Sequence, residues 1–205
     1  TSFQESGGSM VFRNRQARVA RDGAVEWNDF IGNAGFLSLR ATTALAGEGA
    51  SVIHQVGYAG AGNTVADIDA RIIHRAPRTD SSMRMRLTAS GQARVVCQGT
   101  VAIDPGARGS SGFQDIRGMT FDAAEIDPIP HLEIGTAEVK CGHAVTVSPF
   151  DEESLFYLSS RGINEADARK ALLQSFYAPL FQKNAGSAAA QEGARFIKRA
   201  IQSLE

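Results

Sequence analysis

Cysteine is scarce in this chain. Only two of its 205 residues are cysteines, Cys97 and Cys141, and they lie too far apart to form a CxxC pair. This spacing excludes a zinc ribbon and a thioredoxin-type redox motif. Two thiols in a domain of this size favour a reducing compartment, although one structural disulfide also fits. We therefore expect a cytoplasmic protein.

The chain also lacks an excess of charge of either sign. Its 21 basic and 22 acidic residues leave a formal net charge of −1, and the basic residues are scattered along the sequence. Nucleic acids and anionic membranes are bound through basic patches, so neither is expected as a partner. No apolar run approaches the ~20 residues that a membrane-spanning helix needs.

Targeting and nucleotide-binding motifs are missing as well. The first nine residues are polar and carry no signal-peptide pattern. Because residue 1 is threonine, we expect the chain to begin inside a longer protein or after a removed tag. The turn at 60–62 is rich in glycine but lacks the lysine and the helix start of a phosphate loop. We therefore expect this chain to bind no nucleotide.

Short alternating segments fill the first two thirds of the chain. Met83–Leu87 alternates apolar and basic residues with a period of two, which is typical of a half-buried strand. Another run places small or apolar residues on one face: Val95, Cys97, Gly99, Val101 and Ile103. Many short strands without intervening helices imply a sandwich, a barrel or a β-helix. No sharp sequence repeat is present, so periodicity alone does not choose among these folds.

Helix signals begin at Ser148. Ser148 is predicted as an N-cap, with Pro149 in the first helical position and Asp151 in the third. A second helix is predicted to begin at Asn164 and to end or kink at Pro179, and a third follows a loop at 184–187. The chain should thus comprise a β core over residues 1–147 and a helical subdomain over residues 148–205.

The second predicted helix carries two apolar stripes. One consists of Ala168, Ala171, Leu172, Ser175 and Phe176, and the other of Leu173, Tyr177, Leu180 and Phe181. The helical region is too short to form a core of its own, so one stripe should cover the β core. The remaining surface is expected to bind a partner through Phe176, Tyr177, Leu180 and Phe181. Burial of Tyr177 and Phe181 within the chain is the alternative.

Two segments near the end of the β core form a distinctive motif. Val139–Val147 reads VKCGHAVTV, and Leu155–Ile163 reads LFYLSSRGI. Together they resemble the signature of the SufB/SufD family, which belongs to the iron–sulfur cluster assembly machinery. Upstream, Gln98–Ile103 and Pro130–Ile134 resemble further elements of this family, as does His74-Arg75-Ala76-Pro77. The resemblance covers nearly the whole chain.

The resemblance implies a fold that the pattern did not choose. SufB and SufD proteins are flattened parallel β-helices with C-terminal helices, so we expect a β-helix over residues 1–147. Family members usually carry an N-terminal helical region and earlier rungs, which we expect this chain to lack. An open rung can pair with another chain, so the isolated chain is expected to dimerise, as a homodimer, or to aggregate.

Two positions favour a SufD-type over a SufB-type chain. By alignment Ile116 stands where SufB-type subunits carry a sulfur-accepting cysteine, and Ala144 follows His143 where they carry glutamate. The histidine-rich stretch common in SufD is replaced by Val65–Asp69, which has no histidine. The resemblance therefore implies a SufD-like, non-catalytic scaffold subunit. Its expected partners are a SufB-type subunit and a SufC-type ABC ATPase.

Cys141 and His143 are the candidate ligands of a nascent iron–sulfur cluster. On a strand they project from the same face. From the residue pattern alone, His143 is more often a buried, hydrogen-bonded histidine. The resemblance implies instead that His143 ligates a transient cluster shared with the partner subunit. Cys141 is the weaker candidate and Cys97 is expected in the core, because cysteine is among the most buried residues.

Two other functions stay open at this stage. A β-helical carbohydrate-active enzyme would need paired acids, and Asp67 and Asp69 share a strand face. Such alternating strands more often form a solvated face. A self-associating Suf-like scaffold would act without a SufB-type partner.

Overall fold

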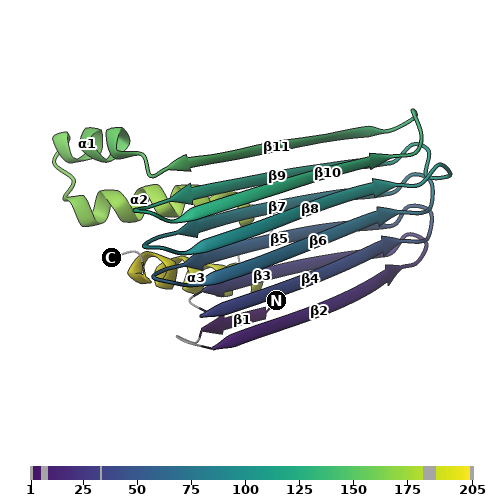
Figure 1. Ribbon diagram of the computed structural model, residues 1–205. Coiled ribbons are helices and arrows are strands. Elements are labelled where there is room, and N and C mark those ends of the chain that lie inside the picture. The colour runs from purple at the N-terminus through teal and green to yellow at the C-terminus, as the bar shows by residue number, and fades with distance from the viewer. Residues whose placement is uncertain (1, 6–8, 33, 182–187, 204–205) are drawn as a thin grey trace.

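The structure is a computed structural model that describes residues 2–5, 9–32, 34–181 and 188–203 (Figure 1). Two parallel sheets account for most of it. The odd-numbered sheet contains β1 (Ser2–Glu5), β3 (Ala24–Gly32), β5 (Ser51–Gly60), β7 (Asp80–Ala89), β9 (Ser111–Thr120) and β11 (Lys140–Pro149). The even-numbered sheet contains β2 (Met10–Val19), β4 (Phe36–Leu45), β6 (Val65–His74), β8 (Arg94–Ile103) and β10 (Glu125–Ile134).

Successive strands alternate between the two sheets. Each strand inside a sheet pairs in parallel with the strand two places before it and the strand two places after it, as β7 does with β5 and β9. The chain therefore winds into a flattened parallel β-helix of about five turns. The expected β-helix is confirmed. The absence of a sequence repeat is compatible with this fold, because stacked strands must share a register but need not share a sequence.

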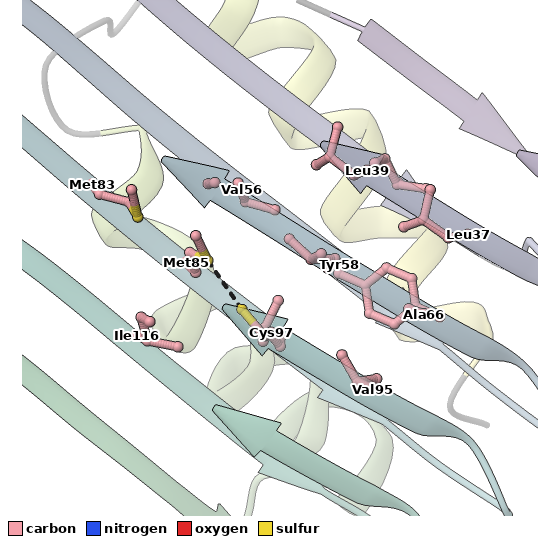
Figure 2. Close-up of a cluster of buried hydrophobic side chains, with 14 of the residues drawn as sticks. Leu37, Leu39, Val56, Tyr58, Ala66, Met83, Met85, Val95, Cys97 and Ile116 are labelled. Carbon is pink, nitrogen blue, oxygen red and sulfur yellow. Dashed lines mark hydrogen bonds between the residues drawn. The ribbon is translucent and has the colours of Figure 1, made fainter. Parts of the chain in front are cut away.

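Inward-facing side chains stack in columns because neighbouring strands pair without a shift. Val56, Met85 and Ile116 are register partners on β5, β7 and β9, and all three are fully buried. Cys97 enters the same core from β8, and its thiol donates to Met85 Sδ at 3.1 Å (Figure 2). The alternation in Met83–Leu87 thus corresponds to buried methionines and leucine between outward arginines, as predicted.

Turns at one end of the strands form a ladder of their own. The Gln92 N–H donates to Gly62 O at 2.8 Å, and the Ala123 N–H donates to Gly91 O at 3.0 Å. Gly62 and Gly91 have φ values of +65° and +69°, which glycine adopts without steric cost. These turns keep consecutive rungs in register.

Four helical segments follow the last strand: α1 (Glu152–Ser160), α2 (Glu165–Tyr177), the 3₁₀ helix η1 (Ala178–Leu180) and α3 (Ala188–Ser203). The predicted cap at Ser148 is wrong. Ser148 and Pro149 still pair with β9, and Asp151 caps α1 by accepting from the Ser154 N–H at 2.9 Å. Proline is tolerated there because β11 is an edge strand. The predicted start of the second helix at Asn164 is confirmed, because Asn164 is the N-cap of α2 and accepts from the Asp167 N–H. The predicted loop at 184–187 lies outside the described residues.

The helices α2 and α3 cover part of the outer face of the odd-numbered sheet (Figure 1). Tyr177 and Leu180 are buried there against Phe30, and Phe196 joins them from α3. The Tyr177 hydroxyl donates to Tyr58 O at 2.8 Å and contacts Thr88 Oγ1 at 2.7 Å. The expectation that this stripe faces outward is therefore wrong for Tyr177 and Leu180.

The other two residues of the expected partner surface also pack within the chain. The Phe181 ring lies 5.2 Å from the Phe30 ring, and Phe176 meets Tyr177 edge-on at 5.3 Å. Both keep intermediate exposure. The alternative of packing within the chain therefore describes this stripe, because its aromatic residues meet Phe30 and Phe196 on the outer face of the odd-numbered sheet.

Candidate functional site

The last rung of the β-helix is open. β11 pairs only with β9 and β10 only with β8 among the described strands, so both sheets end at the same end of the solenoid (Figure 1). Side chains that face inward from β11 continue the interior columns but have no further rung above them. Residues at this end therefore combine an interior position with access to solvent.

Cys141 and His143 occupy two such inward positions. Cys141 is the register partner of Gly112, and His143 is the register partner of Gln114. His143 is exposed and Cys141 is half-buried. The interpretation of His143 as a buried, hydrogen-bonded histidine therefore does not hold in this chain. Its imidazole is available to a ligand that approaches from the open end.

Gln114 forms a floor beneath His143. Its side chain is 2% exposed and crosses the interior, where its amide Nε2 donates to the His131 carbonyl on β10 at 3.1 Å. The two sheets are thus tied together one rung below the candidate site. A ligand of His143 can reach the ring from the open end, but not through the packed interior.

The Cys141 thiol lies at the margin of a small apolar cluster formed by Val101, Ile103 and Ala107. Burial raises the pKa of Cys141, and a hydrogen bond from the Gly112 backbone opposes this shift. The free chain therefore holds Cys141 as a neutral thiol at neutral pH. Ligation would require a metal to displace the proton, which iron can do for a cysteine ligand.

The described residues do not complete a metal site. No group of three or more histidine, cysteine, aspartate or glutamate residues gathers anywhere in the ranges that the structure covers. Iron–sulfur clusters generally take four protein ligands, whereas β11 offers one imidazole and one thiol. The remaining ligands would have to come from outside the described part of this chain.

Cys97 is not a second ligand. It is fully buried in the core, and burial raises its pKa to about 12. A thiol that stays protonated and enclosed has neither the charge nor the access to bind metal. The prediction that Cys97 belongs to the core is confirmed.

The paired acids on β6 are engaged by an arginine. Arg40 on β4 reaches Asp67 at 2.7 Å and Asp69 at 3.0 Å on the outer face of the even-numbered sheet. All three side chains are partly exposed. This is the solvated, ion-paired face that the alternating pattern favoured, so the pair is not poised as the acid and base of a sugar-cleaving enzyme.

Exposed aromatic residues on α1 were not among the predicted site residues. Phe156 is 75% exposed and Tyr157 is 56% exposed. Both belong to the LFYLSSRGI segment that carried the family resemblance, and this segment was the only signal that could have identified them.

No helix in the described ranges is long and apolar enough to cross a membrane.

Comparison with known proteins points to one family. The family model described as "SUF system FeS cluster assembly, SufBD core domain" matches residues 1–176. An iron–sulfur cluster assembly SufBD family protein of Staphylococcus aureus strain USA300 is 33% identical over 184 residues, which cover 88% of this chain and 39% of that protein. A SufBD family protein of Staphylococcus saprophyticus is 32% identical over 188 residues, or 90% of this chain and 40% of that protein. The chain thus spans about two fifths of the length of these relatives.

Proposed function

Because this chain belongs to the SufBD family of iron–sulfur cluster assembly proteins, we propose that it is a SufD-like scaffold subunit. It holds a nascent cluster transiently, together with a SufB-type subunit, and a SufC-type ABC ATPase drives the rearrangement of the complex. The chain itself performs no catalytic step and binds no nucleotide. The nascent cluster is its cargo.

The exposed position of His143 at the open end is the observation that carries the proposal. Neutral imidazole is a good ligand for iron, and histidine replaces cysteine in some clusters. With one histidine and one cysteine on β11, the ligand set is incomplete within the described residues. A second subunit at this end would complete it, which is what a shared, transient cluster requires.

The edge of β11 is the better place for that subunit to dock. β10 contains Pro128 and Pro130, which have no N–H to donate to a neighbouring strand. β11 has proline only at its last position, Pro149. An added strand would therefore pair with β11 and bring its own ligands next to His143.

The buried position of Ile116 supports a SufD-like rather than a SufB-like role. Ile116 is fully buried in the column that contains Met85. An aliphatic side chain cannot accept sulfur, so this chain would not receive persulfide sulfur at that position. Sulfur delivery would fall to the SufB-type partner.

The exposed aromatic pair on α1 is the surface that we propose for the ATPase. Phe156 and Tyr157 supply apolar area with one polar tip, a composition common in interface anchors. This assignment replaces Tyr177 and Leu180, which are buried against the odd-numbered sheet.

Substitution of His143 tests the proposed role directly. His143→Ala is compared with His131→Ala, which removes an exposed histidine from the outer face of the adjacent edge strand, and with Cys141→Ser. Each variant is reconstituted with iron and sulfide, alone and with the SufB-type and SufC-type subunits. Cluster formation is followed by visible absorption, and folding by thermal melting.

We expect His143→Ala to abolish cluster formation in the complex while its melting temperature stays near that of the parent. Cys141→Ser should have a weaker effect, and His131→Ala none. Unchanged assembly by His143→Ala would refute the ligand role. Full assembly by the chain without a SufB-type subunit would instead support the self-associating scaffold, and light scattering at several concentrations would then show a homodimer.

Titration calorimetry with the ATPase tests the docking surface. We expect Phe156→Ala combined with Tyr157→Ala to weaken binding by about tenfold or more. Phe12→Ala is the control, because Phe12 is similarly exposed but lies on β2 at the opposite end of the solenoid. Equal affinity in the double variant and the control would exclude α1 as the docking surface.

A further inference from the structure

A groove runs across the outer face of the odd-numbered sheet, beside the area that the helices cover. It has a volume of about 480 Å³ and is formed by β7, β9 and β11. Its outward-facing side chains include Arg84 on β7 and Phe113, Asp115 and Arg117 on β9. A volume of this size suits a small molecule.

Arginine outnumbers carboxylate around this groove. Asp115 is already engaged twice, by Arg86 at 2.5 Å and by Arg117 Nε at 3.1 Å. Arg84 is half-buried, and it makes no ion pair with any residue that the structure describes. The single carboxylate of Asp115 therefore lies among three guanidinium groups, and the surplus positive charge lies beside the groove.

The crowding of these cations has an energetic consequence. Burial lowers the pKa of Arg86, Asp115 raises it, and the nearby charges of Arg117 and Arg84 lower it again. Holding like charges together at a partly buried site is unfavourable unless an anion compensates them. An anion in the groove would relieve this repulsion while gaining charge-assisted hydrogen bonds.

An apolar wall stands beside the charged side chains. Phe113 is 51% exposed, and a Cβ built on Gly142 would lie 3.5 Å from its ring. The ring therefore rests against the bare backbone of β11, with one face open to the groove. A ligand that combines an oxyanion with a compact apolar portion matches these surroundings.

We propose that this groove binds the carboxylate or phosphate group of a small molecule, with Arg84 and Arg117 as donors and Phe113 as the apolar wall. The planar guanidinium fork matches both oxyanions, and Asp115 orients Arg117 through its Nε atom and leaves its terminal nitrogens available. The groove borders the proposed cluster site, because His143 lines it together with Gly142 and Ala144. Its proposed donors, Arg84 and Arg117, lie on β7 and β9 and are not among the candidate cluster ligands. Its test does not depend on cluster assembly.

The experiment titrates the folded chain at low ionic strength with inorganic phosphate and, in a parallel arm, with citrate. Binding is followed by calorimetry and by backbone NMR shifts. The variants are Arg84→Gln with Arg117→Gln, and Ala144→Glu, which places a carboxylate in register with Asp115. Arg71→Gln is the matched control, because Arg71 lies on the other sheet and pairs with Glu133 at 2.7 Å.

We expect saturable binding of at least one probe, with shifts confined to β7, β9 and β11. Both groove variants should weaken it by about tenfold or more, and Arg71→Gln should leave it unchanged. The arm with tighter binding identifies the oxyanion class. Equal binding by the groove variants and the control, or absence of saturable binding in both arms, would overturn the proposal. Melting curves verify that each variant is folded, and Ala144→Glu retains all three arginines and so provides an independent test.

Discussion

The middle of the β-helix and its open end contain the same columns of side chains in two different environments. His54, Met83, Gln114 and His143 follow one another in register on β5, β7, β9 and β11. The first three are at most 2% exposed, whereas His143 is exposed. In the neighbouring column Val56, Met85 and Ile116 are fully buried, but Val145 is only partly buried.

This difference shows that burial in a solenoid is supplied by the next rung. Residue type does not decide it, because a histidine occupies the buried position on β5 and the exposed position on β11. His54 is held in the interior by the Asp29 carboxylate at 3.1 Å. At the last rung the same kind of side chain keeps an interior orientation but has a free face, which suits it to ligand binding.

The largest expected difference is between two variants that shorten a side chain of the same interior column, one in the middle of the β-helix and one at its open end. Ile116→Ala would leave a cavity in the closed part of the core, and should lower the free energy of unfolding by about 2–5 kcal/mol. Val145→Ala removes a partly exposed side chain from the open rung, and should cost about 1 kcal/mol or less. Urea unfolding of both variants measures the difference. Similar losses would show that the last rung is as tightly packed as the middle.

Acid should weaken the closed rungs through His74. This residue is fully buried on β6, where Nδ1 contacts Thr79 Oγ1 at 2.7 Å and Nε2 contacts Ser81 Oγ at 2.8 Å. Burial lowers its pKa to about 4, although the charge of Asp80 opposes the shift. The unfolded chain has a histidine pKa of about 6.5, so it binds the proton more readily than the folded chain.

The stabilising effect of neutral His74 is therefore complete above pH 6.5 and is lost as the pH falls towards 4. The loss should approach about 3 kcal/mol at pH 4, at about 1.4 kcal/mol per pH unit. His74→Gln cannot take up a proton, so its free energy of unfolding should fall less steeply over this interval. Parallel slopes for the parent and the variant in denaturant melts from pH 8 to pH 4 would contradict the assignment.

The smallest expected effect extends the comparison to the helices. Tyr177→Phe removes a buried hydroxyl that bonds to Tyr58 O and Thr88, and should lower the free energy of unfolding by about 1–3 kcal/mol. Tyr157→Phe makes the same change on the exposed face of α1 and should be neutral within about 0.5 kcal/mol. Thermal and urea unfolding of the pair distinguishes the two faces. A neutral Tyr177→Phe would mean that these hydrogen bonds do not hold the helices on the sheet.

Particular residues show how far the sequence could be interpreted. Alternation correctly placed Met83, Met85 and Leu87 inside, because strand geometry sends every second side chain to one face. The start of the second helix at Asn164 was predicted correctly, because the capping that begins a helix depends only on neighbouring residues. Serine is also a residue type that often caps a helix, but the pairing of Ser148 with Met119 on β9 keeps Ser148 in a strand. Such a pairing between segments distant in sequence leaves no local signal.

The sequence by itself determined the family, the alternating strands, the helical tail and the choice of Cys141 and His143 as candidates. Each of these depends on local residue patterns or on a motif. Only the tertiary structure decided that Tyr177 is buried, that His143 stands on an open rung, and that Arg84, Arg86 and Arg117 gather around one carboxylate. These properties depend on which strands become neighbours and where the stacking stops. Both result from packing of the whole chain, and no short segment encodes them.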